Sequence, residues 1–178
     1  MRRSFLILVV MCVASILASA QAPPMPKPGP ELKKLDYFAG TWTCDGVNKP
    51  GPMGPGGKMT MSEESKWMEG GFFVVTHSQF KSSDMGNGSG AAVLGYDLDE
   101  KKYTYDEFNS MGERVHAKGT VDGDAWTWTS DMKMGPQTMT GRFSEKILSP
   151  AAYTIKFEMS PDGASWNLVM DGKCTKNK

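Results

Sequence analysis

The sequence predicts an all-β protein, a single antiparallel meander of about ten strands that closes into a barrel, with a short helix near one barrel end. Short segments rich in Thr, Val, Tyr, Phe and Trp recur from Thr41 onward, and turn residues separate them at regular intervals. Two cysteines, Cys44 and Cys174, lie near the two ends of this patterned region. Such a pair can join the first and last strands, and a meander whose ends meet is a barrel without exposed edges.

A short helix is expected before the first strand, over residues 31–39. Leu32, Leu35 and Phe38 are spaced three apart on one helical face, and Gly40 is well suited to end the last turn.

Ten strands follow, and each is expected to pair with its neighbours along the chain. Val121-Asp122-Gly123-Asp124 and Pro161-Asp162-Gly163 predict tight hairpins, because glycine readily takes the positive φ that these turns need. We expect strands at 41–47, 57–67, 72–81, 90–97, 102–109, 113–121, 124–131, 137–145, 152–159 and 164–174.

Alternation within the strands indicates which side is buried. In the ninth strand Tyr153, Ile155 and Phe157 share one face, as expected for a sheet that meets water on one side only. The same parity in the last strand places Trp166, Leu168, Met170 and Cys174 on the inner face, and Trp42 and Cys44 share the inner face of the first. Both sulfurs then lie on the same, inner side, and a disulfide between the two strands requires a common side.

The first 20 residues predict a secretory signal peptide. Arg2 and Arg3 form the positive start, residues 5–17 are mostly apolar, and Ala18-Ser19-Ala20 offers small residues for cleavage. Cys12 would leave with this leader. Disulfides persist in oxidising compartments, so we expect a secreted or periplasmic protein that has no membrane attachment after cleavage.

The rest of the chain predicts a linker and one domain. Residues 21–30 form a Pro-rich linker, and residues 31–178 form the barrel domain. Cleavage after Ala20 leaves 158 residues, with 18 basic against 20 acidic side chains and a net charge of −2. This balance favours neither nucleic acid nor an anionic membrane surface as a partner.

Several motifs resemble one bacterial family. The segment 35–42, LDYFAGTW, resembles the opening of lipocalin-like barrels, with a short helix followed by Gly-x-Trp. The motifs at 67–72, 94–97, 102–103, 109–112 and 153–163 are similar in order and spacing to those of the family known as domain of unknown function 1579, over about Leu32 to Lys176. The resemblance implies a calycin-like barrel, but the family offers no activity or catalytic residues to carry over.

A ligand cavity in the barrel lumen is the leading functional hypothesis. Aromatic and acidic side chains share the inner parity. Side chains can just fill the interior of an eight-stranded barrel, and a barrel of about ten strands encloses more space. The candidate ligand-binding residues for a small apolar molecule are Tyr103, Tyr105, Glu107, Trp126, Trp128, Phe157 and Trp166. In the alternative, these rings fill the interior, and the protein acts through its outer surface as an interaction module.

Other chemistry receives less support from the sequence. Methionines flank two Gly/Pro-rich turns and would suit Cu(I), but their two-residue spacing is also that of core residues on one strand face. His77 and His116 are candidate haem ligands in principle, although His116 alternates with charged residues. No metal or cofactor is therefore predicted. No nucleophile or phosphate-binding motif is present, and an enzyme built on paired carboxyls stays an open alternative, because nothing in the sequence selects the pair.

Overall fold

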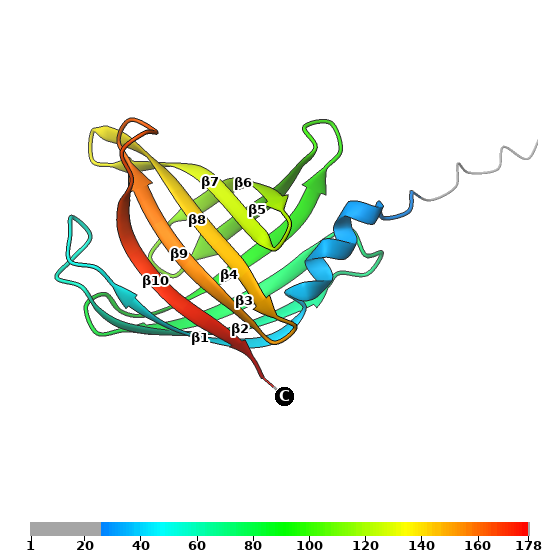
Figure 1. Cartoon of the computed structure of the whole chain (residues 1–178), viewed down its shortest axis with the longest axis horizontal. Coiled ribbons are helices and arrows are strands. Elements are labelled where there is room, and N and C mark those ends of the chain that lie inside the picture. The colour runs from blue at the N-terminus through cyan, green and yellow to red at the C-terminus, as the bar shows by residue number, and fades with distance from the viewer. Residues whose placement is uncertain (1–25, 178) are drawn as a thin grey trace, which may run out of the picture.

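The computed structural model describes residues 26–177, which form a closed barrel of ten antiparallel strands (Figure 1). Each strand pairs with its neighbours along the chain, and the first also pairs with the last, in the order β1-β10-β9-β8-β7-β6-β5-β4-β3-β2. The elements are the helix η1 (Pro30–Tyr37) and the strands β1 (Gly40–Asn48), β2 (Gly57–Trp67), β3 (Val74–Ser82), β4 (Gly86–Asp97), β5 (Lys102–Asn109), β6 (Arg114–Asp122), β7 (Ala125–Met134), β8 (Gln137–Ser149), β9 (Ala152–Ser160) and β10 (Asn167–Lys176).

The predicted meander and all ten strands are confirmed, and the differences lie at strand ends. The strand β4 begins at Gly86, four residues earlier than predicted, because glycine-rich sequence usually indicates a loop. Here the ring of Phe80 on β3 covers the backbone of its cross-strand partner Gly88, and a Cβ at Gly88 would lie 2.3 Å from the Cζ atom of that ring. Gly88 therefore continues the strand, because the ring of Phe80 needs the space beside its backbone.

The predicted short helix is present and is a 3₁₀ helix, η1, which lies at one end of the barrel (Figure 1). A 3₁₀ helix has three residues per turn, so residues spaced three apart share one face. Leu32, Leu35 and Phe38 are all buried there. The indole N–H of Trp42 donates to the backbone carbonyl of Phe38 at 2.9 Å and fixes the connection from η1 to β1.

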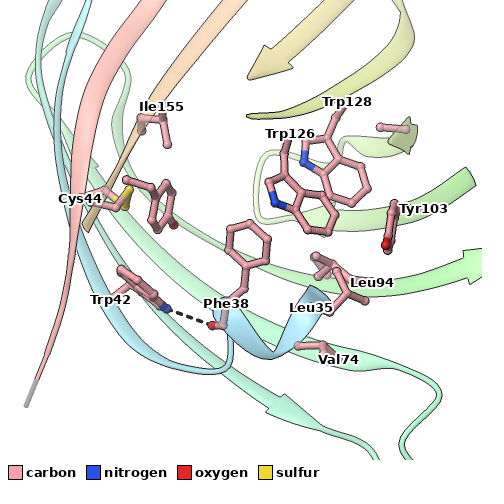
Figure 2. Close-up of a cluster of buried hydrophobic side chains, with 14 of the residues drawn as sticks. Leu35, Phe38, Trp42, Cys44, Val74, Leu94, Tyr103, Trp126, Trp128 and Ile155 are labelled. Atoms are coloured by element: carbon pink, nitrogen blue, oxygen red, sulfur yellow. Dashed lines mark hydrogen bonds between the residues drawn. A yellow bond between two sulfur atoms is a disulfide. The ribbon is translucent and has the colours of Figure 1, made fainter. Parts of the chain in front are cut away.

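Aromatic side chains next to η1 pack against one another inside the barrel (Figure 2). The ring of Phe38 makes edge contacts with Trp126 and Tyr153, at centroid distances of 5.2 and 5.7 Å, and Trp42 lies 4.8 Å from Tyr153. We call Phe38, Trp42, Tyr103, Trp126 and Tyr153 the aromatic layer. It closes the lumen at the η1 end.

Replacement of Leu35 by alanine is expected to lower the free energy of unfolding by about 3 kcal/mol, because its fully buried side chain packs into the closed end of the barrel. Urea denaturation of the purified domain measures the change. Lys34→Ala, an exposed position of the same helix, is the matched control and should change the free energy by less than about 0.5 kcal/mol. Equal effects of the two variants would contradict the packing of η1 into the end of the barrel.

The barrel closes along a seam between β1 and β10, which a disulfide crosses. Cys44 and Cys174 are direct cross-strand partners, both fully buried, and their sulfurs are bonded as predicted. Two residues further along, Gly46 pairs with Gly172, and a Cβ at Gly172 would lie 2.6 Å from the carbonyl oxygen of Asp45. The two backbones approach each other closely at this pair, so the seam favours glycine.

The start of β10 differs from the prediction. The strand begins at Asn167, and its register with β9 shifts between Leu168 and Met170. This irregularity interrupts the alternation on which the inner position of Trp166 was based. The guanidinium of Arg142 instead lies over the ring of Trp166, with its Cζ atom 3.8 Å from the ring centroid. Arg142 also forms an ion pair with Glu158. Because Phe143 and Phe157 next to these two residues face the lumen, Trp166 lies on the outer surface.

The predicted signal peptide, residues 1–20, and residues 21–25 of the predicted linker lie outside the described residues. Residues 26–29 form neither helix nor strand. Among residues 26–177, no helix is long and apolar enough to cross a membrane.

Candidate functional site

The lumen contains a cavity of about 250 Å³ between the aromatic layer and the barrel end opposite η1. All the strands except β1 contribute to its wall. The lining residues are Met59, Met61, Glu63, Ser78, Leu94, Tyr105, Glu107, Val115, Ala117, Trp128, Ser130, Met132, Phe143, Glu145, Tyr153, Ile155, Phe157 and Met170. The barrel is therefore not completely filled by its own side chains.

Most of the wall is apolar and adaptable. Four methionines and two phenylalanines contribute, namely Met59, Met61, Met132, Met170, Phe143 and Phe157. Methionine has a flexible, polarizable side chain, so this part of the wall can adjust to the shape of a bound molecule. Met59 and Met61 share one strand face and point inward, which fits the two-residue spacing of core residues, and Val115 and Ala117 also point inward.

Three carboxyls from strands far apart in the sequence, Glu63 on β2, Glu107 on β5 and Glu145 on β8, face the same cavity. Each accepts a hydrogen bond from an aromatic side chain. The Tyr105 hydroxyl donates to Glu107 at 2.7 Å, and the Trp128 indole N–H donates to Glu145 at 3.0 Å. The Tyr153 hydroxyl lies 3.4 Å from Glu63, a longer contact.

The environment of Glu63 and Glu145 favours their protonated forms. Burial raises the pKa of Glu63 to about 7, against the effect of the Tyr153 hydrogen bond, and the negative charge of Glu107 adds to the increase. Burial also raises the pKa of Glu145 to about 8, against the Trp128 hydrogen bond and with a contribution from Glu63. Near neutral pH, both groups are therefore present in protonated and ionised forms.

The two tyrosines of the cavity stay neutral. Burial raises the pKa of Tyr105 well above its ordinary value, and the charge of Glu107 raises it further. Burial likewise raises the pKa of Tyr153, with contributions from Glu63 and Glu145. Both hydroxyls therefore act as hydrogen-bond donors to the carboxyls at physiological pH.

Two glycines make room for the polar side of the cavity. A Cβ at Gly90 would lie 2.8 Å from Oε1 of Glu107, and a Cβ at Gly119 would lie 2.5 Å from the indole ring of Trp128. Side chains at these positions would displace Glu107 and Trp128, which explains why glycine interrupts β4 and β6 there.

The predicted ligand-binding residues occupy three different environments. Tyr105, Glu107, Trp128 and Phe157 line the cavity. Tyr103 and Trp126 point inward but belong to the aromatic layer, where their rings are 4.7 Å apart, and Trp166 lies outside the barrel.

Sequence reasoning missed Glu63 and Glu145. A signal for both was present, because Glu63 has the parity of the inward residues Met59 and Met61, and Glu145 has that of Phe143. Three carboxyls, of which only Glu107 was predicted, therefore share this cavity.

Both histidines and four further methionines lie away from the cavity. The His116 ring contacts Asp106 at 2.8 Å on the outer surface, and His77 is exposed. Met53, Met134, Met139 and Met159 line a separate recess beside the β1–β2 connection. Among residues 26–177, no three or more His, Cys, Asp or Glu side chains are grouped to hold a metal ion.

The fold and the cavity define a β-barrel protein with a partly open lumen. Residues 27–176 match the model of the family described as "Protein of unknown function (DUF1579)". The chain belongs to this family, as its sequence motifs predicted. No curated protein matches the sequence.

A solved structure shares the barrel fold. The Rv2717c protein from M. tuberculosis aligns with a TM-score of 0.59 and 13% identity, over 85% of this chain and 100% of that one. Two others align with TM-scores too low to establish a common fold. The S-type phycobiliprotein lyase CPES from Guillardia theta has a TM-score of 0.48 and 10% identity, over 82% of this chain and 92% of that one. A de novo designed fluorescence-activating β-barrel has a TM-score of 0.44 and 15% identity, over 80% of this chain and 95% of that one.

Proposed function

We propose that this protein binds a small, mostly apolar molecule in the barrel lumen. The proposal rests on the cavity itself. Methionine and aromatic side chains form most of its wall, and three carboxyls face it. Ligand pockets combine mostly apolar walls with a few convergent polar groups. A volume of about 250 Å³ lies just below the range of roughly 300–1,000 Å³ for drug-sized ligands, so the ligand is compact.

We further propose that binding takes place outside the cytoplasm, in the periplasm or after secretion. The disulfide between Cys44 and Cys174 supports an oxidising compartment, and the apolar leader supports export. The mass of the protein purified from its host tests this directly. A chain that begins near Gln21 supports export, and a chain that retains residues 1–20 contradicts cleavage.

Tryptophan fluorescence tests lumen binding, because Trp128 lines the cavity and Trp166 lies outside the barrel. The probe is 4-bromobenzyl alcohol, a compact neutral molecule whose bromine quenches tryptophan emission on contact. We expect saturable quenching of the wild-type protein. Trp128→Phe should lose most of the saturable component, and the matched variant Trp166→Phe should retain it.

A cavity-filling variant provides the second control. Ala117 is buried and faces the cavity, so Ala117→Leu should weaken probe binding by roughly tenfold or more while circular dichroism remains that of the wild type. Quenching that rises linearly with probe concentration, or equally in all variants, would contradict a lumen site. Native mass spectrometry of the host-purified protein then searches for the natural ligand.

An acid–base enzyme is the second candidate, and the raised pKa values of Glu63 and Glu145 favour it. Carboxyls that titrate near neutral pH are suited to proton transfer. Mass spectrometry of a ligand after prolonged incubation separates the two functions. A ligand recovered unchanged supports binding, and a converted ligand supports catalysis.

A further inference from the structure

Acidic side chains line the lumen cavity, and no basic side chain in the described part of the barrel faces them there. Glu63, Glu107 and Glu145 face the cavity, and no lysine, arginine or histidine is among the described residues that line it. Within residues 26–177, none of these three carboxyls takes part in an ion pair. A ligand in the cavity therefore meets hydrogen-bond acceptors and negative charge that no protein cation balances.

The donors of the protein use only part of the acceptor capacity of these carboxyls. Tyr153, Tyr105 and Trp128 each donate one hydrogen bond, to one oxygen of Glu63, Glu107 and Glu145 respectively. A carboxylate has two oxygens with about four acceptor positions. Within the described chain, no fully buried side-chain nitrogen or oxygen lacks a partner, so the second oxygens open into the cavity. There they are available to N–H donors of a ligand.

We propose that the lumen ligand is a compact amphipathic amine, bound as its ammonium ion with the nitrogen among Glu63, Glu107 and Glu145. This inference rests on the proposed function, because it assigns the chemical class of the molecule in the lumen. The apolar body of the amine packs against the methionine and phenylalanine side chains of the wall. A charge-assisted hydrogen bond to a carboxylate is roughly twice as strong as a neutral one, which selects the ammonium head group.

The strand register gives the orientation of the ligand. Glu63 pairs with Trp42 across the β1–β2 ladder, and Glu145 pairs with Trp126 across the β7–β8 ladder, so both carboxyls lie next to the aromatic layer. Met59 and Met132 are closer to the opposite barrel end. The ammonium group therefore lies next to the aromatic layer, and the apolar body extends toward the barrel end opposite η1.

An organic cation fits this arrangement better than a metal ion. Among residues 26–177, no group of three or more His, Cys, Asp or Glu side chains could hold a metal ion. The N–H donors of an ammonium ion point in different directions, so one ligand can reach carboxyls on separate strands.

Binding of the ammonium ion is coupled to proton release. In the empty cavity, burial keeps Glu63 and Glu145 partly protonated near neutral pH, and the groups that face them are Glu107 and the neutral tyrosines 37, 105 and 153. A bound cation favours the ionised carboxylates, so each proton that leaves a carboxyl passes to the solvent and the ion pair remains. Affinity for the ammonium form therefore rises from pH 6 to pH 8.

Isothermal titration calorimetry with three matched probes tests the inference. The probes are 2-phenylethylammonium, 2-phenylethanol and phenylacetate, which share the phenyl ring and differ in head-group charge. We expect the ammonium to bind roughly 10- to 100-fold more tightly than the alcohol at pH 8, and phenylacetate to bind most weakly. The heat of ammonium binding should also depend on the ionisation enthalpy of the buffer, which reports the released protons.

Matched variants locate the effect. Glu63→Gln and Glu145→Gln keep the shape of the side chain, and each should lower the preference for ammonium over alcohol by roughly tenfold. Glu64→Gln is the control, because Glu64 is exposed on the same strand and faces outward, and it should leave the preference unchanged.

The outcomes distinguish this inference from the proposed function. If the alcohol binds in the lumen as tightly as the ammonium, the amine assignment is overturned and lumen binding stands. If no probe binds, including the neutral bromoarene, the proposed function fails as well. An ammonium preference that survives Glu63→Gln, Glu145→Gln and the double variant would also overturn the assignment.

Discussion

Removal of the Cys44–Cys174 disulfide is expected to lower the free energy of unfolding by about 5 kcal/mol, the value that the chain-entropy model gives for a separation of 130 residues. The bond connects the first and last strands of the barrel, so its loss frees almost the whole domain in the unfolded state. Its position at the β1–β10 seam means that the native barrel also loses its covalent closure. Urea denaturation with and without a reducing agent measures the change.

The double variant Cys44→Ala/Cys174→Ala provides the control for this experiment. It should unfold at the lower urea concentration of the reduced wild type, and the reducing agent should not change it further. Mass spectrometry under denaturing conditions should detect two hydrogens fewer in the oxidised wild type than in its reduced form. Equal midpoints for oxidised and reduced wild type would show that the seam is held by strand pairing and packing alone.

The stability of the barrel is expected to fall by about 4 kcal/mol between pH 5 and pH 8, because Glu63 and Glu145 must ionise inside the lumen. Their pKa values in the folded protein, about 7 and about 8, exceed the ordinary value of 4.5. The folded state therefore holds more protons than the unfolded chain in this range. The stabilisation is complete below pH 4.5 and is lost as the pH rises through the two folded-state values.

The magnitude follows from the conversion of one pKa unit to about 1.4 kcal/mol, reduced because the effective dielectric constant of a protein interior is higher than that of a dry apolar medium. Denaturant unfolding at several pH values measures it. Glu63→Gln/Glu145→Gln should give a nearly flat profile and should be more stable than the wild type at pH 8. Glu64→Gln, on the outer face of the same strand, should retain the wild-type slope, and a sloped profile for the double variant would refute this explanation.

The sequence predicted the architecture well because the barrel follows from local signals. Alternation of apolar and polar residues indicated the inner face of each strand, and glycine-containing turns such as Asp122-Gly123 separated the strands. The closure followed from one further inference, that inward Cys44 and inward Cys174 meet across a seam. Each of these signals depends on neighbouring residues or on a single pair.

The candidate site was only partly predictable, because it depends on depth along the barrel axis. Tyr103 and Tyr105 have the same parity, yet the first packs into the aromatic layer and the second lines the cavity, and only the position of η1 separates them. Glu63 and Glu145 come from β2 and β8, and their approach across the lumen depends on the stagger of all the strands between them. Trp166 was misplaced because a local irregularity of β10 is invisible to alternation.

The covalent link at the seam has a consequence for proteolysis. Any single cleavage of the backbone between Cys44 and Cys174 produces two fragments that the bond still holds in one molecule. The hairpins at Gly123 and Gly135, both with positive φ, are exposed examples of where a protease can cut. A nicked barrel therefore keeps its two pieces at high effective concentration and separates them only when it meets a reductant.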